Sequence, residues 1–472
     1  MYQFSNIQQL QSDLREGRIT CVKLTEEAIE RIGSSKRLNA FLEVFEKSAL
    51  RQASVVDGRI REGTAGRLAG VIVGLKDNIC YKGHRVSASS KILEGFESLY
   101  SATVVEKLLA EDAIIIGRLN CDEFAMGSSN ENSAFGNVLN PLDEKRVPGG
   151  SSGGAAAAVA AELCHLTLGS DTGGSIRQPA SFTGTIGLKP TYGRVSRYGL
   201  IAYASSFDQI GPITRSVADA ALVMEVISGQ DPRDNTSSSR KKGEYTRELN
   251  SGKKYRIAYI KECVEAEGID PEVKSVVMSQ IDQLRSRGHQ VEAISFPYLD
   301  YLVPIYYVLT TAEASSNLAR FSGVHYGYRS PDATDLENTY KKSRSEGFGA
   351  EVKRRIMLGT FVLSAGYYDA YYSKGQKVRR VIRDKTEEIL KHHDFILTPS
   401  TPGTAFEFGK NSSDPIKMYL EDIFTVQANI AGVPAISVPC GKHSNGMPIG
   451  LQVMAGNFEE GKLFDLASTI EA

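Results

Sequence analysis

Two glycine- and serine-rich segments near the middle of the chain carry the first residues that could do chemistry. They read Gly149-Gly-Ser-Ser-Gly-Gly154 and Gly169-Ser-Asp-Thr-Gly-Gly-Ser175, and nine of the 44 glycines lie between Gly149 and Gly187. Glycines leave backbone N–H groups unobstructed, as an oxyanion hole requires, so the serine after Thr-Gly-Gly is a candidate nucleophile. The first segment lacks the Lys-Ser/Thr that ends a nucleotide-binding P-loop. Taken alone, each segment could instead be a turn with a serine helix cap.

A serine nucleophile needs a base, and Lys76 is the candidate. The seven histidines have no Gly-x-Ser-x-Gly motif beside them, so nothing supports a Ser-His-Asp triad. Lysine serves as the base where burial lowers its pKa from about 10.4 towards neutrality. Lys76 directly follows the apolar run 71–75, which is predicted to be a buried strand. The alternative is an ion pair between Lys76 and Asp77 at the end of that strand.

Three blocks, in this order, resemble the amidase signature family: Gly74–Ile79, Gly149–Gly154 and Gly169–Pro179. Further blocks are similar to the branch of this family that hydrolyses glutamine for tRNA-dependent amidation. These blocks are Asp122–Ser129, Glu131–Gly136, Gly187–Ile201, Arg354–Thr360, Gly366–Tyr372 and Gly432–Pro439. The resemblance covers essentially the whole chain. One departure is Ala155, which stands where the family usually has serine.

The resemblance implies a Ser–cis-Ser–Lys triad. Ser175 would be the nucleophile that forms an acyl-enzyme, Ser151 the bridging serine and Lys76 the base. Ser152 would be a loop or helix-cap hydroxyl outside the triad. The oxyanion hole would consist of backbone N–H groups around Thr172, Gly173, Gly174 and Ser175.

The resemblance also implies residues that bind the substrate. Arg355 would hold the α-carboxylate of glutamine in a bidentate fork, and Asp422 would hold its α-ammonium group. Ser128 and Tyr306 are expected in the pocket wall, where either could also be a packing or cap residue. From the sequence alone, Arg355 and Asp422 could also be solvated helix charges. No metal site is expected.

The implied function is that of a glutaminase subunit, which hydrolyses glutamine to glutamate and ammonia. The ammonia would convert Glu-tRNA(Gln) to Gln-tRNA(Gln), and the resemblance leaves open whether Asp-tRNA(Asn) is also converted. This subunit would use no cofactor. A B subunit would bind the mischarged tRNA and use ATP and Mg²⁺, and a small C subunit would complete a heterotrimer.

Two other functions remain as alternatives. A stand-alone amidase for small carboxamides would use the same triad, but would not need Arg355 and Asp422. A catalytically silent scaffold would hold a partner, and would not need all three triad positions filled.

Apolar runs alternate with helical patterns along most of the chain, which is typical of a sheet covered on both faces. Strands are expected at 71–75, 113–116, 166–168, 255–260, 394–397, 435–438 and 449–454, and helices at 103–110, 155–162, 217–228, 271–287, 363–392 and 416–430. The prediction is a single large α/β/α domain over 1–472, with a central mixed β-sheet flanked by helices, as in the amidase signature fold. Residues 6–61 are predicted to be helical, and the N-terminal helices of residues 1–65 are expected to pack on the core. The polar stretch 230–254 is predicted to be a surface loop.

The overall composition argues against a stand-alone nucleic-acid-binding protein. The 55 Lys and Arg residues balance 56 Asp and Glu residues, giving a net charge of −1. The basic segment 374–385 could face RNA or be a solvated helix face. The six cysteines form no C-x-x-C pair, which is typical of reduced thiols. Neither a signal peptide nor an apolar run of ~18 residues is present in the sequence, so a cytoplasmic protein is expected.

Overall fold

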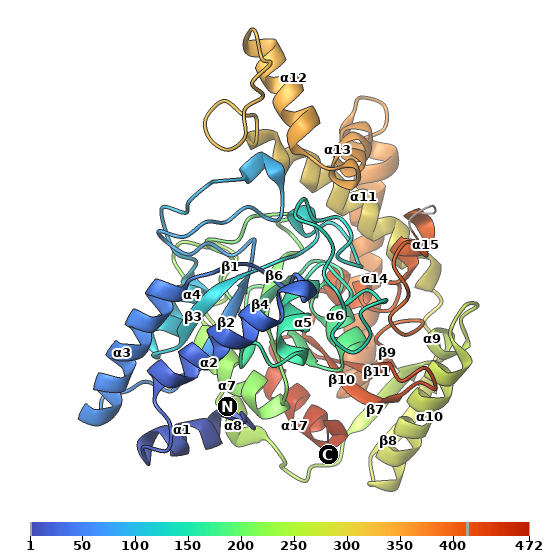
Figure 1. Ribbon diagram of the computed structural model, residues 1–472. Coiled ribbons are helices and arrows are strands. Elements are labelled where there is room, and N and C mark those ends of the chain that lie inside the picture. Colours follow the sequence, from blue (N-terminus) through green and yellow to red (C-terminus); the bar gives the residue numbers. More distant parts are fainter. Residues whose placement is uncertain (1, 412–414, 472) are drawn as a thin grey trace.

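The computed structural model describes residues 2–411 and 415–471, and within them one mixed sheet of 11 strands carries the fold (Figure 1). The strands are β1 (Phe41–Val44), β2 (Ile72–Lys76), β3 (Ile114–Leu119), β4 (Leu166–Asp171), β5 (Ile186–Lys189), β6 (Gln209–Thr214), β7 (Arg256–Ile260), β8 (Gln290–Ile294), β9 (Phe395–Pro399), β10 (Ala435–Lys442) and β11 (Pro448–Ala455). Their order across the sheet is β1-β3-β2-β4-β6-β5-β10-β11-β9-β7-β8. The pairs β2–β3, β2–β4, β7–β8 and β7–β9 are parallel and the other pairs are antiparallel. The predicted α/β fold with a central mixed sheet is confirmed.

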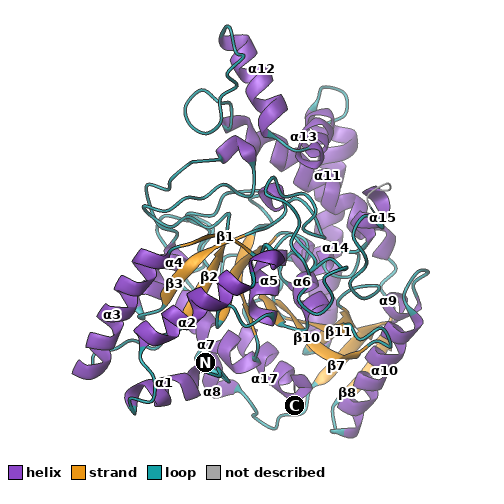
Figure 2. Cartoon of the chain, in the orientation of Figure 1, coloured by secondary structure: helices purple, strands orange, loops and turns teal. Residues whose placement is uncertain are grey.

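Helices flank this sheet (Figure 2). Those before β7 are α1 (Ile7–Arg15), α2 (Cys21–Ser34), α3 (Glu46–Glu62), α4 (Thr103–Ala110), α5 (Gly153–Ala160), α6 (Arg177–Thr183), α7 (Val217–Ile227) and α8 (Tyr245–Glu248). Those after it are α9 (Lys261–Glu265), α10 (Pro271–Ser286), α11 (Leu299–Asn317), α12 (Leu336–Gly347), α13 (Ala350–Leu363), α14 (Lys374–His392), α15 (Pro415–Leu420), α16 (Val426–Ala431) and α17 (Glu460–Glu471). Helices α12 and α13 project beyond the sheet at the top of Figure 1.

The strands that lead to the candidate site are buried along their whole length. Every residue of β2 and of β4 is buried, as expected for parallel strands covered on both faces. Helix α5, which is built from glycine, alanine and one valine, packs on β4. A Cβ atom on Gly154 would lie 2.3 Å from the Asn120 carbonyl oxygen, so only glycine permits this close approach of helix and loop. The small residues of α5 therefore bring the loop before it close to the strand ends.

All seven strands expected from the sequence are present, but β1, β5, β6 and β8 were not predicted. Strands β1 and β5 have only four residues each, and β6 contains Gly211 and Pro212, which are rare inside strands. Strands β1 and β5 are too short for a periodic pattern to stand out, and β8 has no buried residue to mark it as a core strand.

Three predicted boundaries differ from the structure. Residues 6–61 are not wholly helical, because Phe41–Val44 form β1 and pair antiparallel with β3 at the edge of the sheet. The predicted helix 363–392 begins too early, because α13 ends at Leu363, Gly366 adopts a φ of 85°, and a short π-helix (Asp369–Ser373) then leads into α14. The predicted helix 416–430 is divided into α15 and α16. The stretch 230–254 contains the short helix α8.

Over residues 2–411 and 415–471, none of the helices combines the length and the apolar character that crossing a membrane would require.

The central strands should dominate the stability of this fold. Leu168 in β4 is 0% exposed, whereas Leu99 is 80% exposed. We expect Leu168→Ala to lower the free energy of unfolding by about 2–5 kcal/mol, because it removes buried apolar contacts and leaves a cavity. Leu99→Ala is the matched control and should change it by less than about 0.5 kcal/mol. Thermal unfolding of both variants checks this, and equal melting temperatures would contradict it.

Candidate active site

Two neighbouring parallel strands end at the same edge of the sheet and position the first of the predicted site residues. Lys76 is the last residue of β2 and Asp171 is the last residue of β4. The turn that carries Ser175 follows β4, and the loop that carries Ser151 leads into α5. Crevices at the carboxyl ends of strands are the usual place for ligand sites in open α/β sheets.

Lys76 is fully buried and contacts two serine hydroxyls. Its Nζ lies 2.6 Å from Ser151 Oγ, 3.0 Å from Ser152 Oγ and 3.4 Å from the Ser170 carbonyl oxygen. Burial lowers the pKa of Lys76 to about 8, because removal from water disfavours the charged ammonium form. The alternative pairing of Lys76 with Asp77 is wrong, since Asp77 instead forms an ion pair with Arg118 at 2.9 Å.

Ser152 is a loop hydroxyl, which is one of the two possibilities predicted for it. It precedes α5, but its side chain makes no helix-cap hydrogen bond. Its hydroxyl donates to the Ser170 carbonyl oxygen at 3.1 Å and accepts from Lys76 Nζ. The helix-cap possibility is therefore wrong: Ser152 is one of the partners that a buried amine needs.

The loops of Ser151 and Ser175 are joined directly. The Gly150–Ser151 peptide bond is cis, as the resemblance implies. The Ser151 carbonyl oxygen accepts the Asp122 N–H at 3.2 Å, and the Ser152 N–H donates to the Ser175 carbonyl oxygen at 3.1 Å. A Cβ atom on Gly150 would lie 2.1 Å from Asp122 Oδ2, so no larger residue fits there. Lys76 thus contacts Ser151, and the loop that carries Ser151 is hydrogen-bonded to the backbone of Ser175.

The turn around Ser175 is held by one carboxylate. Asp171 Oδ1 accepts the Gly174 N–H at 2.9 Å, and Asp171 Oδ2 accepts the Ile176 N–H at 3.1 Å. The Gly174 N–H is therefore not available to an oxyanion, and the prediction for this group is wrong. The N–H groups of Thr172, Gly173 and Ser175 stay as predicted donors.

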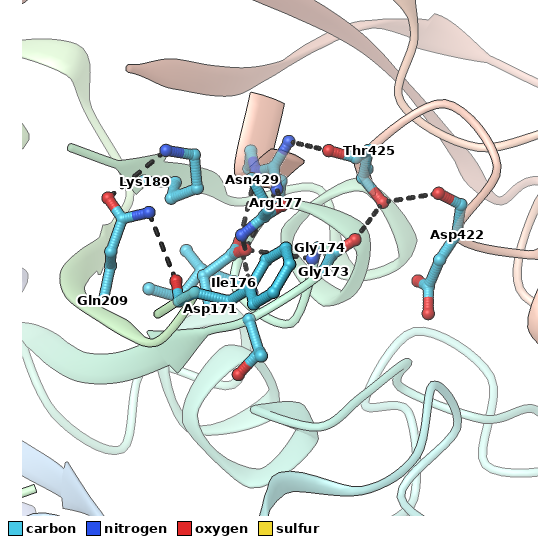
Figure 3. Close-up of polar contacts among 12 residues, drawn as sticks. Asp171, Gly173, Gly174, Ile176, Arg177, Lys189, Gln209, Asp422, Thr425 and Asn429 are labelled. Carbon is cyan, nitrogen blue, oxygen red and sulfur yellow. Dashed lines mark hydrogen bonds and ion pairs between the residues drawn. The ribbon is translucent and has the colours of Figure 1, made fainter. Parts of the chain in front are cut away.

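Arg177 anchors that carboxylate inside the protein (Figure 3). Its Nη2 lies 2.9 Å from Asp171 Oδ1, its Nε lies 3.1 Å from Oδ2, and both side chains are 0% exposed. Burial alone would raise the pKa of Asp171, but the Arg177 guanidinium outweighs it and holds the pKa at about 2. Arg177 also donates to the Thr425 carbonyl oxygen at 2.8 Å, to Asn429 Oδ1 at 2.6 Å and to Gln452. The buried ion pair thus has the further hydrogen bonds that such a pair requires.

Three of the four predicted substrate-binding residues lie around the Ser175 turn. Asp422 Oδ2 accepts a hydrogen bond from the Ser128 hydroxyl, while its Oδ1 is buried without a hydrogen-bond partner among the described residues. Burial raises the pKa of Asp422 to about 8. The Tyr306 ring packs on Gly173, where a Cβ atom would lie 2.5 Å from the ring. An unpartnered acceptor next to the nucleophile turn is a suitable place for a substrate cation.

Arg355 is buried on α13, beside three tyrosine rings. Its Nε lies 2.8 Å from Glu351 Oε1, and its Nη1 donates to the Tyr203 hydroxyl at 2.9 Å. Its guanidinium carbon lies 5.0 Å from the centre of the Tyr307 ring. The interpretation of Arg355 and Asp422 as solvated helix charges is wrong, because both side chains are buried.

Comparison with known proteins identifies the family. The sequence profile of the amidase family matches residues 23–464. The chain belongs to the amidase family. It is 53% identical to the A subunit of the glutamyl-tRNA(Gln) amidotransferase of Chlorobium phaeobacteroides, over 99% of both chains. The crystal structure of the corresponding protein from Thermotoga maritima, which has the same name, matches with a TM-score of 0.79 and 43% identity, covering 97% of this chain and 95% of the other. The peptide amidase of Stenotrophomonas maltophilia matches with a TM-score of 0.83 and 29% identity, covering 100% and 97%.

Sequence reasoning missed several residues that organise the site of this amidase. Asp171 and Arg177 lie within the block Gly169–Pro179, and their opposite charges in an otherwise uncharged stretch were an available signal. Thr425 gave no such signal, because its role depends on the approach of α16 to β4. The same holds for Ser152, whose hydroxyl points to Lys76 only in the folded chain.

The Asp171–Arg177 pair generates a stability prediction. Arg177→Met leaves a buried carboxylate without its cation, so we expect a loss of about 3–5 kcal/mol in the free energy of unfolding. Adding Asp171→Asn should recover some of that loss, because the uncompensated charge is then removed. Thermal unfolding of the two single variants and the double variant checks this, and additive losses would contradict it.

Proposed function

We propose that this chain is the glutamine-hydrolysing component of a tRNA-dependent amidotransferase. The observation that carries the proposal is the 2.6 Å contact between Lys76 Nζ and Ser151 Oγ in a loop joined to the Ser175 turn. The relative from Chlorobium phaeobacteroides, an amidotransferase chain at 53% identity over almost its whole length, supports it.

The chemistry is a proton relay. Neutral Lys76 accepts a proton from the Ser151 hydroxyl, which in turn accepts the proton of Ser175. Ser175 Oγ attacks the carboxamide carbon, and N–H groups among Thr172, Gly173 and Ser175 stabilise the oxyanion. The proton returns through Ser151 to the leaving nitrogen, and ammonia departs. Water then attacks the acyl-enzyme by the same route and releases glutamate.

Recognition of glutamine follows from the charges around the turn. The α-ammonium group would bind the unpartnered Asp422 Oδ1, and the α-carboxylate would bind Arg355. Ser128 orients Asp422 through its hydroxyl, and Tyr306 forms the wall beside Gly173. These contacts would select an amino-acid amide over a simple carboxamide.

The ammonia would pass to a partner. In this proposal a B subunit binds Glu-tRNA(Gln) and activates it with ATP and Mg²⁺, and a small C subunit completes a heterotrimer. This chain needs no cofactor for its own half-reaction. Since the acceptor is a charged tRNA, the complex belongs in the cytoplasm.

The first test is ammonia release from glutamine by the full chain, alone and with its partner subunits, Glu-tRNA(Gln) and ATP. We expect release that rises in the complex and falls at least ~10⁴-fold in Ser175→Ala, because the nucleophile is lost. A Ser175→Ala variant that keeps its activity would contradict the triad. Rapid hydrolysis of simple carboxamides, indifferent to the partners and to Asp422→Asn, would instead identify a free amidase.

The second test is the pH dependence of glutamine hydrolysis. The base must be neutral, and Lys76 with a pKa of about 8 becomes neutral as the pH rises through that value. We therefore expect kcat to rise with pH and level off above about 8. In the substrate complex the ammonium group keeps Asp422 ionised, whereas in the free enzyme the pKa of Asp422 is also about 8.

The value of kcat/KM reports the groups of the free enzyme, in which both Lys76 and Asp422 must lose a proton. Below pH 8, kcat/KM should therefore rise more steeply with pH than kcat does. Asp422→Asn should reduce the slope of kcat/KM from two protons to one, while the pH dependence of kcat keeps its midpoint. A kcat that does not change between pH 6.5 and 9 would exclude Lys76 as the base.

A further inference from the structure

Thr425 lies between the residue that would bind the substrate ammonium and the turn that carries the nucleophile (Figure 3). It is 0% exposed and directly precedes α16. Its hydroxyl donates to the Gly173 carbonyl oxygen at 2.6 Å and lies 3.0 Å from the Asp422 carbonyl oxygen. The Thr425 N–H also donates to the Asp422 carbonyl oxygen at 3.0 Å. One side chain therefore contacts both sides of the site.

The peptide between Gly173 and Gly174 is held at both of its polar atoms. Thr425 Oγ1 binds its carbonyl oxygen, and Asp171 Oδ1 binds its N–H. Since a peptide unit is planar, these two contacts fix its orientation and so direct the backbone that enters Ser175. A Cβ atom on Gly174 would lie 2.2 Å from Thr425 Oγ1 and 3.3 Å from Asp422 Oδ1. The Gly174 backbone therefore lies against the Thr425 hydroxyl and close to the Asp422 carboxylate.

Both contacts are connected to Arg177, but only the carbonyl contact is also connected to Asp422. Asp171 is fixed by Arg177, which also binds the Thr425 carbonyl oxygen. The N–H end of the peptide is thus tied to a rigid, fully buried ion pair. The carbonyl end is tied through a single hydroxyl to the segment that carries Asp422, whose Oδ1 has no partner among residues 2–411 and 415–471.

We propose that Thr425 is a positioning residue that determines specificity, because its hydroxyl couples the occupant of Asp422 to the geometry of the Ser175 turn. An α-ammonium group bound at Asp422 draws this segment to its reactive position, and Thr425 moves the Gly173–Gly174 peptide with it. A carboxamide without an α-amino group leaves Asp422 unoccupied, so its kcat does not depend on the Thr425 hydroxyl. The inference rests on the proposed glutaminase function.

The experiment compares glutamine with 4-carbamoylbutanoate, which is glutamine without its α-amino group. Thr425→Val keeps the shape of the side chain but cannot donate to the Gly173 carbonyl oxygen. We expect kcat for glutamine to fall on the order of 10- to 100-fold, since misplacing a reacting group by ~1 Å has such an effect. The kcat for 4-carbamoylbutanoate should fall less than about threefold, so that the ratio of the two kcat values, which measures the preference for glutamine, decreases. Acyl-enzyme formation in a single turnover gives the same comparison where turnover is slow.

Two control variants separate this role from a structural one. Thr425→Ser retains the hydroxyl and should keep the preference of the unmodified chain. Thr25→Val in α2 removes another buried hydroxyl bonded to a backbone carbonyl, at 2.8 Å and outside the site, and should change neither kcat. If Thr425→Val does not fold, as shown by thermal unfolding, Thr425→Ala takes its place in the same comparison.

Equal losses on both substrates in the Thr425 variant, or no loss on either, would overturn the proposal. Failure of the function itself gives a different result, because the unmodified chain would then release no ammonia from glutamine, alone or with its partners.

Discussion

The site depends on a lysine amine that is completely withdrawn from water. Burying an amine costs free energy unless polar groups surround it. The partners of Lys76 are the Ser151 and Ser152 hydroxyls and the Ser170 carbonyl oxygen. These groups come from the loop before α5 and from the end of β4. The requirement to satisfy one buried nitrogen therefore fixes how the two segments meet at the end of β2. The same withdrawal from water lowers the pKa of Lys76 into the range in which it can serve as a base.

A second buried charge fixes the nucleophile turn. The Asp171 carboxylate binds the N–H groups on either side of Ser175, and Arg177 keeps that carboxylate ionised and in place. Arg177 reaches the segment of Thr425 and Asn429 as well, so the turn and the start of α16 form one hydrogen-bonded unit. Asp422 differs from these groups, because one of its oxygens is buried and has no hydrogen-bond partner among the residues that the structure describes. The Asp171 and Arg177 side chains that hold the turn are fully hydrogen-bonded, whereas Asp422 Oδ1, which would meet substrate, is not.

The sequence allowed much of the fold to be predicted, because long buried strands and amphipathic helices have strong local signals. Strands β2, β4 and β11 each contain a mainly apolar stretch, and the predicted ranges 71–75, 166–168 and 449–454 overlap them. Strands β1 and β5 were missed because four residues are too few for a pattern, and only pairing with a distant partner makes them strands. The predicted helix 363–392 began before Gly366, and only the structure shows the left-handed φ at Gly366 and the start of α14 at Lys374.

The sequence by itself determined the family, the central sheet and the residue types of the candidate triad, since these depend on ordered motifs and local periodicity. It placed Lys76 at the end of a strand, and it placed Ser151 and Ser175 in glycine-rich turns. Only the tertiary structure decided that Ser152 contacts Lys76 and that the Gly174 N–H donates to Asp171. The same is true of Thr425, whose hydroxyl connects Gly173 with Asp422. Such contacts join residues up to 252 positions apart. They depend on which side each peptide and hydroxyl faces once the strands are packed, and no local pattern in the sequence carries that information.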